Sequence, residues 1–379
     1  MIYLNCAATS HERPPEVGEA VLRALEGFGS YGRGAGDEDL DATRLVFRTR
    51  EKLCDLLGFS HPERVCFTSG ATQALNTAIL GLPRRHGRVV ATDWDHNAVL
   101  RPLARLADEQ GVQVDFVSAG SDGALDYDAF EGLLAEPCDF VVCTHASNVT
   151  GMVSDVLRIV ATAHAHGVPV VLDAAQTAGS LPLSMEELGV DVLCVTGHKG
   201  LMGPTGTGAI LVAPGIEMEP LIEGGTGVLS AERRQPAVWP EHLEAGTLNI
   251  CGIAGLGAAI GWLCEIGMET VFDHEQALLM RFLEGLGDIP GIEVYGRCDV
   301  MRTPVVSLNL DGVESSMLAE RLAADHSIAT RAGLHCAPRM HAALGTLGTG
   351  AVRFSFNWFT GEEDISYALF ALRSIAGEL

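Results

Sequence analysis

Lysine is almost absent from this sequence of 379 residues, although acidic residues are abundant. Lys52 and Lys199 are the only two, and the formal net charge is -24 at pH 7. Nucleic acids and anionic membranes attract basic surfaces, so this charge balance argues against either as a partner. Lys199 stands out most, because it lies between a histidine and a glycine in the glycine-rich stretch "VTGHKGLMGPTGTG".

Closely spaced cysteines and long apolar runs are also missing. None of the ten cysteines forms a C-x-x-C pair, and several lie in apolar runs such as "RVCFTS", where free cysteine behaves as a small hydrophobic residue. No run approaches the roughly 20 apolar residues of a membrane-spanning helix, and "MIYLNCAATS" lacks the features of a signal peptide. We therefore expect a cytoplasmic protein in a reducing compartment.

Histidine offers no convincing metal site in this sequence. His164 and His166 resemble a metal-binding pair, but residues two apart point to different sides of a helix. Because they precede Gly167 at an expected helix end, we expect them to interact with the helix dipole instead. No metal is predicted.

Apolar runs of strand length alternate with helical patterns through the first half of the chain. They are apolar throughout, which is typical of strands buried on both faces. The alternation predicts an α/β fold with a mainly parallel sheet. The expected strands are at 64–69, 87–92, 112–117, 139–145, 168–173 and 191–196, and helices are expected over 72–81 and 97–110.

The pattern changes after about Cys251, where two long helical runs precede shorter segments. In "AVRFSFNW" (351–358), apolar and polar residues alternate, which predicts a half-exposed strand of an antiparallel sheet. We therefore predict a large domain over 12–250 and a smaller domain made of 1–11 and 251–379.

Polar residues gather where the expected strands end, which is where open parallel sheets bind ligands. One of these strand ends leads into a helix start, whose N–H groups suit a phosphate. The others supply a histidine ring, a side-chain amide, a carboxylate and the lysine. Pyridoxal phosphate uses all of these together: a lysine for its aldehyde, a carboxylate for its ring nitrogen and N–H groups for its phosphate. The residues are Gly70, Ala71, Thr72, His96, Asn148, Asp173, Gln176, His198 and Lys199.

At this point the sequence resembles the class V aminotransferase family of fold-type-I pyridoxal phosphate enzymes. It is most similar to the SUF-type cysteine desulfurases and selenocysteine lyases. The resemblance implies a mainly parallel seven-stranded sheet in the large domain and a smaller α+β domain. The motifs that carry it are "YLNCAATS", "FTSGATQALN", "DHNAVLRPL", "THASNVTG", "VLDAAQTAG", "TGHKGLMGPTGTG", "EAGTLN" and "TRAGLHCAP".

The resemblance also implies a role for each cofactor-binding residue. Lys199 would join the cofactor's aldehyde, which an arginine cannot do, and His96 would stack on the pyridine ring. Asp173 would pair with the ring nitrogen and Gln176 would bond the ring hydroxyl. The phosphate would be held by Gly70, Ala71, Thr72, Thr196 and His198, together with Thr247 from the other subunit of a homodimer.

On the substrate side, the resemblance makes Cys336 the nucleophile that accepts sulfur. Asn148 and Arg353 would hold the substrate carboxylate, and Arg33 would bind substrate as well. Arg331 and His335 lie close to Cys336 in sequence, and we expect them to lower the pKa of its thiol. The chain departs from its relatives at Asn5, Cys6 and Gly36 and has one extra residue after Lys199.

These features predict a cysteine desulfurase that converts L-cysteine to L-alanine and leaves a persulfide on Cys336 for an acceptor protein. Selenocysteine lysis, another C–S bond cleavage or a transamination would use the same site. A sulfur-relay or scaffold protein is the alternative outside enzymes, although such a protein needs neither Lys199 nor Cys336.

Overall fold

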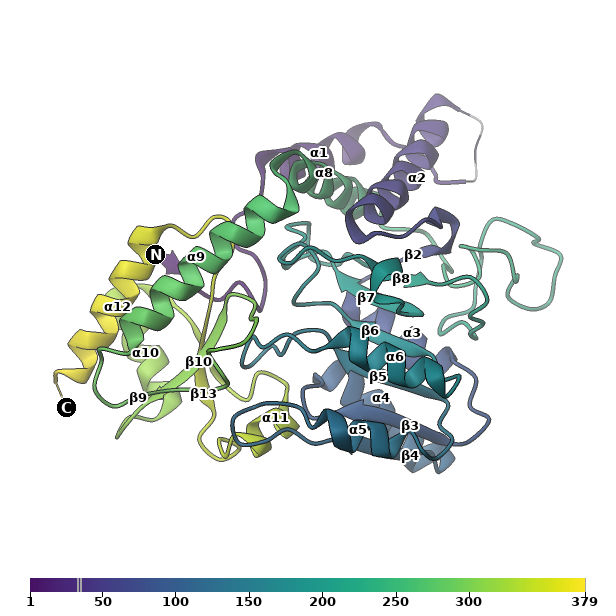
Figure 1. Cartoon of the computed structure of the whole chain (residues 1–379). Helices are drawn as coiled ribbons and strands as arrows, with labels where there is room; N and C mark the ends of the chain where they lie inside the picture. Colours follow the sequence, from purple (N-terminus) through teal and green to yellow (C-terminus); the bar gives the residue numbers. More distant parts are fainter. Residues whose placement is uncertain (33, 35, 379) are drawn as a thin grey trace.

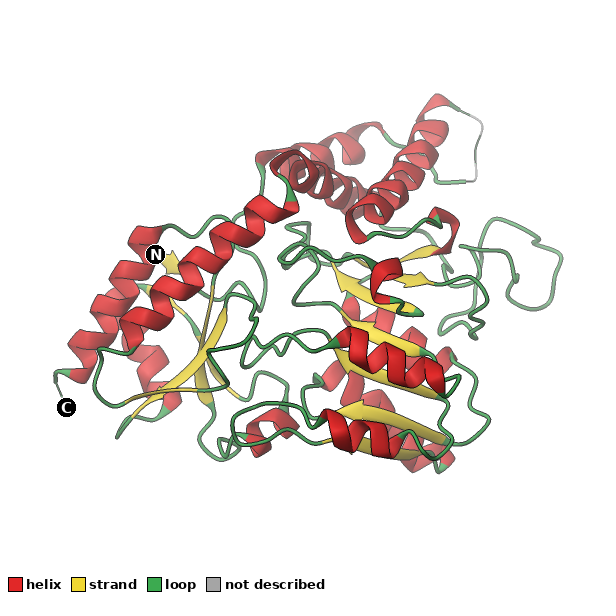
Figure 2. Cartoon of the chain, viewed as in Figure 1, coloured by secondary structure: helices red, strands yellow, loops and turns green. Residues whose placement is uncertain are grey.

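The computed structural model describes residues 1–32, 34 and 36–378. Arg33, which the sequence predicts to bind substrate, lies outside the described residues. Figures 1 and 2 show the arrangement of the elements. The helices are α1 (Pro15–Gly27), α2 (Asp37–Leu57), η1 (Pro62–Arg64, a 3-10 turn), α3 (Ala71–Gly81), α4 (Asn97–Gln110), α5 (Tyr127–Leu133), α6 (Val156–Ala165), α7 (Met185–Leu188), α8 (Ile250–Ile266), α9 (Met268–Leu286), α10 (Ser315–His326), α11 (Pro338–Ala343) and α12 (Glu362–Ala376). The strands are β1 (Ile2–Tyr3), β2 (Val65–Thr68), β3 (Arg88–Thr92), β4 (Gln113–Val117), β5 (Phe140–Thr144), β6 (Val170–Asp173), β7 (Val192–Thr196), β8 (Gly208–Val212), β9 (Ile292–Val294), β10 (Val305–Leu310), β11 (Ile328–Ala329), β12 (Arg331–Gly333) and β13 (Ala351–Ser355).

A mainly parallel sheet of seven strands forms the centre of the larger part of the molecule. Its order is β2-β8-β7-β6-β5-β3-β4, and β8 runs antiparallel to both of its neighbours. The predicted α/β fold with a seven-stranded sheet is therefore confirmed. The strands expected from the sequence correspond to β2 through β7, whereas β8 was missed because it returns beside β7 without an intervening helix.

The sheet is apolar on both faces because successive side chains of a strand point to opposite sides. In β7, Leu193 and Val195 belong to one core cluster, while Val192 and Cys194 belong to another. Helices α5 and α6 pack on the first face and α3 and α4 on the second (Figure 1). This two-sided burial explains the continuous apolar runs in the sequence.

Helix α8 packs against α1 and α2 beside the β2 and β8 edge of the sheet (Figure 1). Its buried residues Ile253, Leu256 and Ile260 share the core cluster that contains Val46 and Leu53 of α2. The domain boundary between residues 250 and 251 stays a prediction. Because α8 packs against helices of the larger part, a boundary between α8 and α9 agrees better with this packing.

The smaller sheet is antiparallel, in the order β12-β13-β10-β9, with α9, α10 and α12 packed on one face. The antiparallel arrangement was predicted correctly, but the half-exposed surface was not. Every residue of β13 is buried, and the Arg353 side chain on its polar face is only 1% exposed. That face is turned toward the large sheet, because Arg353 Nη1 donates to the Asn148 carbonyl at 3.0 Å.

Over the described residues, no single helix has both the length and the apolar composition to cross a membrane. The pair α8 and α9, bent by 81°, meets that test together by length and composition alone. The ten cysteines are free thiols. Within the same residues, no group of three or more His, Cys, Asp or Glu side chains is arranged to hold a metal ion.

Candidate active site

A cavity of about 280 Å³ lies where the carboxyl ends of the central strands meet the smaller sheet. Most of the predicted site residues that the structure describes line this cavity. They are Gly70, Ala71, Thr72, His96, Asn148, Asp173, Gln176, Thr196, His198, Lys199 and Arg353. Residues that are far apart in the sequence converge here because parallel strands end at the same edge of the sheet.

Lys199 follows β7 and Asp173 ends the neighbouring strand β6. Burial lowers the pKa of Lys199 to about 8, although the nearby Asp173 carboxylate opposes this shift and Arg353 adds to it. Burial raises the pKa of Asp173, against the opposing effects of a hydrogen bond from the Ala175 N–H at 2.9 Å and of Lys199. The amine of Lys199 is therefore partly neutral near pH 8, as a nucleophile must be.

His96 is the N-cap of α4, and its Nδ1 accepts a hydrogen bond from the Ala98 N–H at 3.0 Å. This bond fixes the ring at the cavity wall. Burial, together with the nearby charge of Lys199, lowers the pKa of His96 to about 4. The ring is thus neutral near pH 7, which suits stacking on an aromatic ligand.

The start of α3 forms the opposite end of the cavity. Gly70 is its N-cap without a side-chain hydrogen bond, and its φ of 148° is a conformation that glycine adopts readily. Among the described residues, no acceptor is found for the N–H groups of Ala71 and Thr72. A Cβ on Gly208 would lie 2.6 Å from the Gly70 Cα, so the backbone is closely packed behind these donors. Free N–H groups at a helix start attract anions.

His198 and Gln176 tie the cavity to the N-terminal segment. His198 Nδ1 lies 3.1 Å from Thr9 Oγ1, and Gln176 Nε2 donates to the Ala7 carbonyl at 3.1 Å. Burial lowers the pKa of His198 to about 4, and Lys199 adds to that shift. Residues 1–11 therefore contribute directly to one wall.

Asn148 and Arg353 form the polar wall beneath the smaller sheet. Asn148 Oδ1 and Arg353 Nε are buried without a hydrogen-bond partner among the described residues. Arg353 Nη2 makes a long bond of 3.3 Å to Asn5 Oδ1, so one position that departs from the relatives touches the predicted carboxylate clamp. Burial, with Arg331 nearby, lowers the pKa of Arg353 to about 9. Buried donors and acceptors without partners are expected where a ligand completes the site.

Cys336 lies in the loop between β12 and α11 and is partly exposed. Arg331 and His335 of the same segment line the cavity, whereas Cys336 itself is not one of its lining residues. Arg331 Nη2 is 3.8 Å from Cys336 Sγ, so a cation does lie beside the thiol.

The expectation that His335 also assists the thiol as a cation is wrong. Burial lowers the pKa of His335 to about 3, and Arg353 adds to this shift. The two ring nitrogens of His335 lie near the Arg331 carbonyl and His341 Nε2, at 3.0 and 3.2 Å respectively. A neutral ring with both nitrogens engaged does not supply the positive charge.

Thr247 lies outside the cavity in this single chain and lines a neighbouring depression with Ser69 and Gln73. The loop before it is anchored by Glu244, whose carboxylate pairs with both Nη atoms of Arg50 at 2.8 Å. Both partners of this ion pair are buried. Thr247 is thus held on the rim of the molecule.

Asp95 lies directly before His96 and is not among the site residues predicted from the sequence. It is fully buried beside His96 and accepts hydrogen bonds from the Thr92 N–H at 2.7 Å and from Thr144 Oγ1 at 2.8 Å. Burial raises the pKa of Asp95 to about 7. The sequence "DWDH" could have identified Asp95, because an acidic residue directly before the expected stacking histidine lies at the buried end of a strand.

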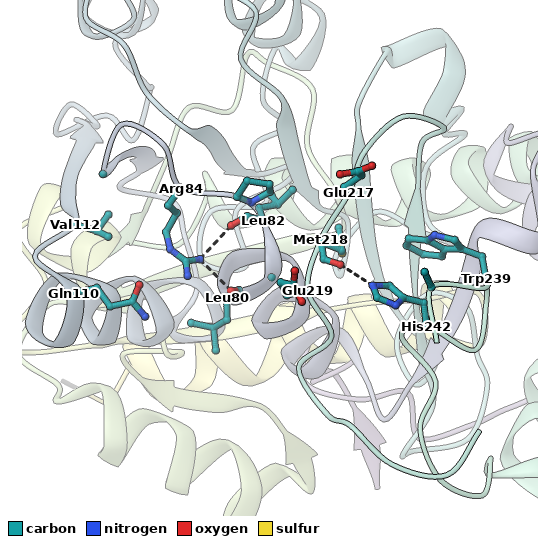
Figure 3. Close-up of a pocket in the computed structure, with 14 residues that line it drawn as sticks. Leu80, Leu82, Arg84, Gln110, Val112, Glu217, Met218, Glu219, Trp239 and His242 are labelled. Carbon is teal, nitrogen blue, oxygen red and sulfur yellow. Dashed lines mark hydrogen bonds between the residues drawn. The ribbon is translucent and has the colours of Figure 1, made fainter. Parts of the chain in front are cut away.

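A larger cavity of about 670 Å³ lies near the end of α3 (Figure 3). None of the predicted site residues in the described part of the chain lines it. Arg84 Nη1 donates to the carbonyls of Leu80 and Leu82, and one ring nitrogen of His242 lies 2.8 Å from the Met218 carbonyl (Figure 3). The other ring nitrogen of His242 lies 2.8 Å from the Pro236 carbonyl. Arg84 and His242 therefore contact the protein's own backbone, and the convergent reactive groups line the smaller cavity.

Comparison with known proteins places these residues in context. The family model described as aminotransferase class-V matches residues 2–368. A probable cysteine desulfurase of Methanothermobacter thermautotrophicus is 34% identical over 388 residues, which cover 99% of this chain and 95% of that protein. The cysteine desulfurase of Haloferax volcanii is 31% identical over 376 residues, which cover 96% and 87% of the two chains.

Solved structures give the same result. The apo structure of a cysteine desulfurase from Thermococcus onnurineus has a TM-score of 0.94 and 32% identity, covering 100% of this chain and 95% of that chain. The cysteine desulfurase CsdA from Escherichia coli has a TM-score of 0.89 and 27% identity, covering 99% and 94%.

Proposed function

Because this chain belongs to the aminotransferase class-V family, we propose that it is a pyridoxal-phosphate-dependent cysteine desulfurase. The reaction would convert L-cysteine to L-alanine and transfer the sulfur to Cys336. The observation that carries this proposal is the convergence of Lys199 and the Cys336 loop at one cavity, where Cys336 contributes to the electrostatic environment of Lys199. The names of the relatives support the same activity.

The described residues fit pyridoxal phosphate. Ala71 and Thr72 would hold its phosphate through their free N–H groups, and Asp173 would face its ring nitrogen with a buried carboxylate. His96 would cover the ring, and Lys199 would bind the aldehyde. When bound, the cofactor supplies an electron sink for the electrons of the substrate's Cα–H bond.

The protein's own residues would then bind the substrate and move its proton. Arg353 and Asn148 would hold the carboxylate of L-cysteine: Arg353 Nε lacks a partner in the described structure, and Asn148 Nδ2 has a second N–H besides the one that it donates to the His335 carbonyl. Arginine suits the carboxylate because it donates two parallel hydrogen bonds. Once the amine of L-cysteine has replaced it at the cofactor's aldehyde, Lys199 would take the Cα proton, since its lowered pKa leaves a large neutral fraction near pH 8.

The sulfur transfer would take place at Cys336. Its thiolate would attack the substrate sulfur, forming an S–S bond while the Cβ–S bond breaks and its electron pair stays on Cβ. A proton then completes the methyl group of alanine, and the persulfide remains on Cys336. Arg331, whose Nη2 lies 3.8 Å from Cys336 Sγ, would place a positive charge beside the attacking sulfur.

We further propose that the active unit is a homodimer that donates its persulfide to an acceptor protein. Thr247 lies on the rim and outside the cavity of its own chain, which suits a residue that reaches the phosphate of the partner subunit. A two-fold dimer would then form two equivalent shared sites. The acidic net charge would suit a basic patch on the acceptor.

One assay tests the proposal and its alternatives. Purified protein would be offered L-cysteine, L-selenocysteine and L-cystine, and alanine release would be measured for wild type, Lys199→Ala and Cys336→Ala. We expect alanine from L-cysteine with wild type alone, and a yellow colour, sensitive to borohydride, that Lys199→Ala lacks. Release from selenocysteine alone would make the protein a selenocysteine lyase. A colourless wild-type protein would favour a scaffold or sulfur relay.

A further inference from the structure

The loop that presents Cys336 has an unusual backbone. His335 has a φ of 49° and Cys336 a φ of 60°, so two consecutive residues that are not glycine adopt left-handed conformations. Such conformations are sparsely populated and persist only where the surroundings hold them in place. The loop therefore needs several fixed contacts.

Two of these contacts come from the loop after β5 and from the start of α4, and they reach only the backbone of the Cys336 loop. Asn148 Nδ2 donates to the His335 carbonyl at 2.7 Å, and the Asn97 N–H donates to the Cys336 carbonyl at 2.7 Å. Neither contact fixes the imidazole ring of His335, which lines the cavity.

The His335 ring is instead held by a buried chain of side chains. Its Nε2 lies 3.0 Å from the Arg331 carbonyl, and its Nδ1 lies 3.2 Å from His341 Nε2. His341 Nδ1 lies 2.8 Å from Thr346 Oγ1. His341 is fully buried, and the two rings stack with their centroids 5.3 Å apart.

This chain determines where the hydrogens lie. A carbonyl only accepts, so His335 Nε2 must donate to Arg331 and His335 Nδ1 must accept. His341 Nε2 is then the donor to His335, which leaves His341 Nδ1 to accept from the Thr346 hydroxyl. Each member thus fixes the tautomer of the next.

We propose that His341 and Thr346 are positioning residues for Cys336, acting through the His335 ring, which they hold against the backbone of Arg331. Because the Arg331 guanidinium contacts the Cys336 thiol, the chain sets the relative position of the nucleophile and its cation. This inference rests on the proposed function. It gives a positioning role to His341 and Thr346, which lie outside the family motifs quoted above.

The charges around the chain favour this arrangement. Arg331, Arg353 and His341 face the His335 ring, and burial lowers the pKa of His335 to about 3 and that of His341 to about 4. Both rings therefore remain neutral at working pH. A proton added to His335 Nδ1 would point at the His341 N–H and break the chain.

The test uses the cofactor-loaded enzyme with Thr346→Val, which keeps the volume of a buried side chain but removes its hydroxyl. Thr349→Val is the control, because Thr349 is exposed and its hydroxyl contacts only the adjacent Gly350 carbonyl at 3.2 Å. The rate of Cys336 alkylation by iodoacetamide would be measured from pH 5.5 to 10 by mass spectrometry of its peptide.

We expect Thr346→Val to slow alkylation at pH 7 by about fivefold and to move the midpoint of the profile upward by about half a pH unit, because the thiolate loses its fixed cation. The control should match wild type. A purely structural role would lower the melting temperature and leave the midpoint in place, which would overturn the inference. His341→Phe, if it folds, should show the same shift.

Turnover separates this inference from the proposed function. In Thr346→Val, kcat for alanine release should fall about fivefold while KM for L-cysteine stays within twofold, because Cys336 acts after binding. An unchanged kcat and an unchanged alkylation midpoint together would refute positioning. Absence of alanine release from wild type would refute the proposed function, and the alkylation profile would still decide the role of His341 and Thr346.

Discussion

Replacing Arg353 by lysine should weaken substrate binding far more than a conservative exchange normally would. The Arg353 side chain is 1% exposed, its Nε has no protein partner and its Nη2 makes only a 3.3 Å bond to Asn5. Two donors on one planar group are therefore available to a carboxylate. A lysine ammonium retains the charge but cannot place two parallel donors.

The size of the effect follows from the lost bond. A hydrogen bond to a charged group is worth about 1.5–3 kcal/mol, and about 1.4 kcal/mol corresponds to a factor of ten in affinity. KM for L-cysteine should then rise about 10- to 100-fold in Arg353→Lys. The assay is alanine release over a range of L-cysteine concentrations, with cofactor absorbance as a direct measure of binding.

Two controls sharpen this test. Arg158→Lys changes a partly exposed arginine that pairs with Asp128 and Glu131 and does not line the cavity, so its KM should equal that of wild type. Cysteamine, which lacks the carboxylate, should bind wild type and Arg353→Lys equally. A KM within twofold of wild type for Arg353→Lys, or an equal loss with cysteamine, would refute the carboxylate role.

Two further predictions concern stability and assembly. Burial raises the pKa of Glu275 to about 8, so the folded protein keeps a proton that the unfolded chain releases above about pH 4.3, and stability should fall as pH rises between these values. Glu275→Gln, which can still accept the hydrogen bond from Ser180, should therefore melt close to wild type at pH 5 and higher than wild type at pH 8.5, and equal differences at both pH values would contradict this reasoning. If Thr247 reaches the partner's site, mixing inactive Lys199→Ala with inactive Thr247→Trp under conditions of subunit exchange should restore about a quarter of wild-type activity, since one site in each mixed dimer is intact. Exchange without recovery would argue against shared sites.

The sequence predicted the large sheet well because its signals are local. Strands buried on both faces give continuous apolar runs, and most of these runs were followed by a helical pattern. Strand β8 was not predicted. It pairs antiparallel with β7 after a glycine-rich turn, and its own apolar run does not indicate which strand it will pair with. The boundary near residue 250 stays a prediction, since α8 packs with α1 and α2 although it opens the helical C-terminal part.

Among the site residues, those placed by a local strand end were predicted, whereas properties that depend on distant packing were not. Asp173, His198 and Lys199 follow expected strands and line the cavity, as the strand-end argument requires. The half-exposed surface expected for residues 351–358 was wrong, because alternation indicates that a strand has two unlike faces and does not say whether the polar face meets water or another part of the protein. The neutral state of His335 depends on His341 and on burial, neither of which is visible from the adjacent residues.

The hydrogen bond from the Asn97 N–H to the Cys336 carbonyl has a consequence for how the nucleophile can vary. Asn97 is the first residue of α4, and the N–H groups of a helix's first turn have no partner within the helix. This spare donor fastens the loop through backbone atoms alone, so Cys336 can be exchanged for another residue without releasing the loop. Proline at position 97 is the one natural substitution that would remove the donor, and the first turn of a helix tolerates it well. The loop that carries Cys336 is thus held both by this backbone bond and by the Asn148 side chain, and only the first of these attachments is independent of the predicted substrate-binding residues.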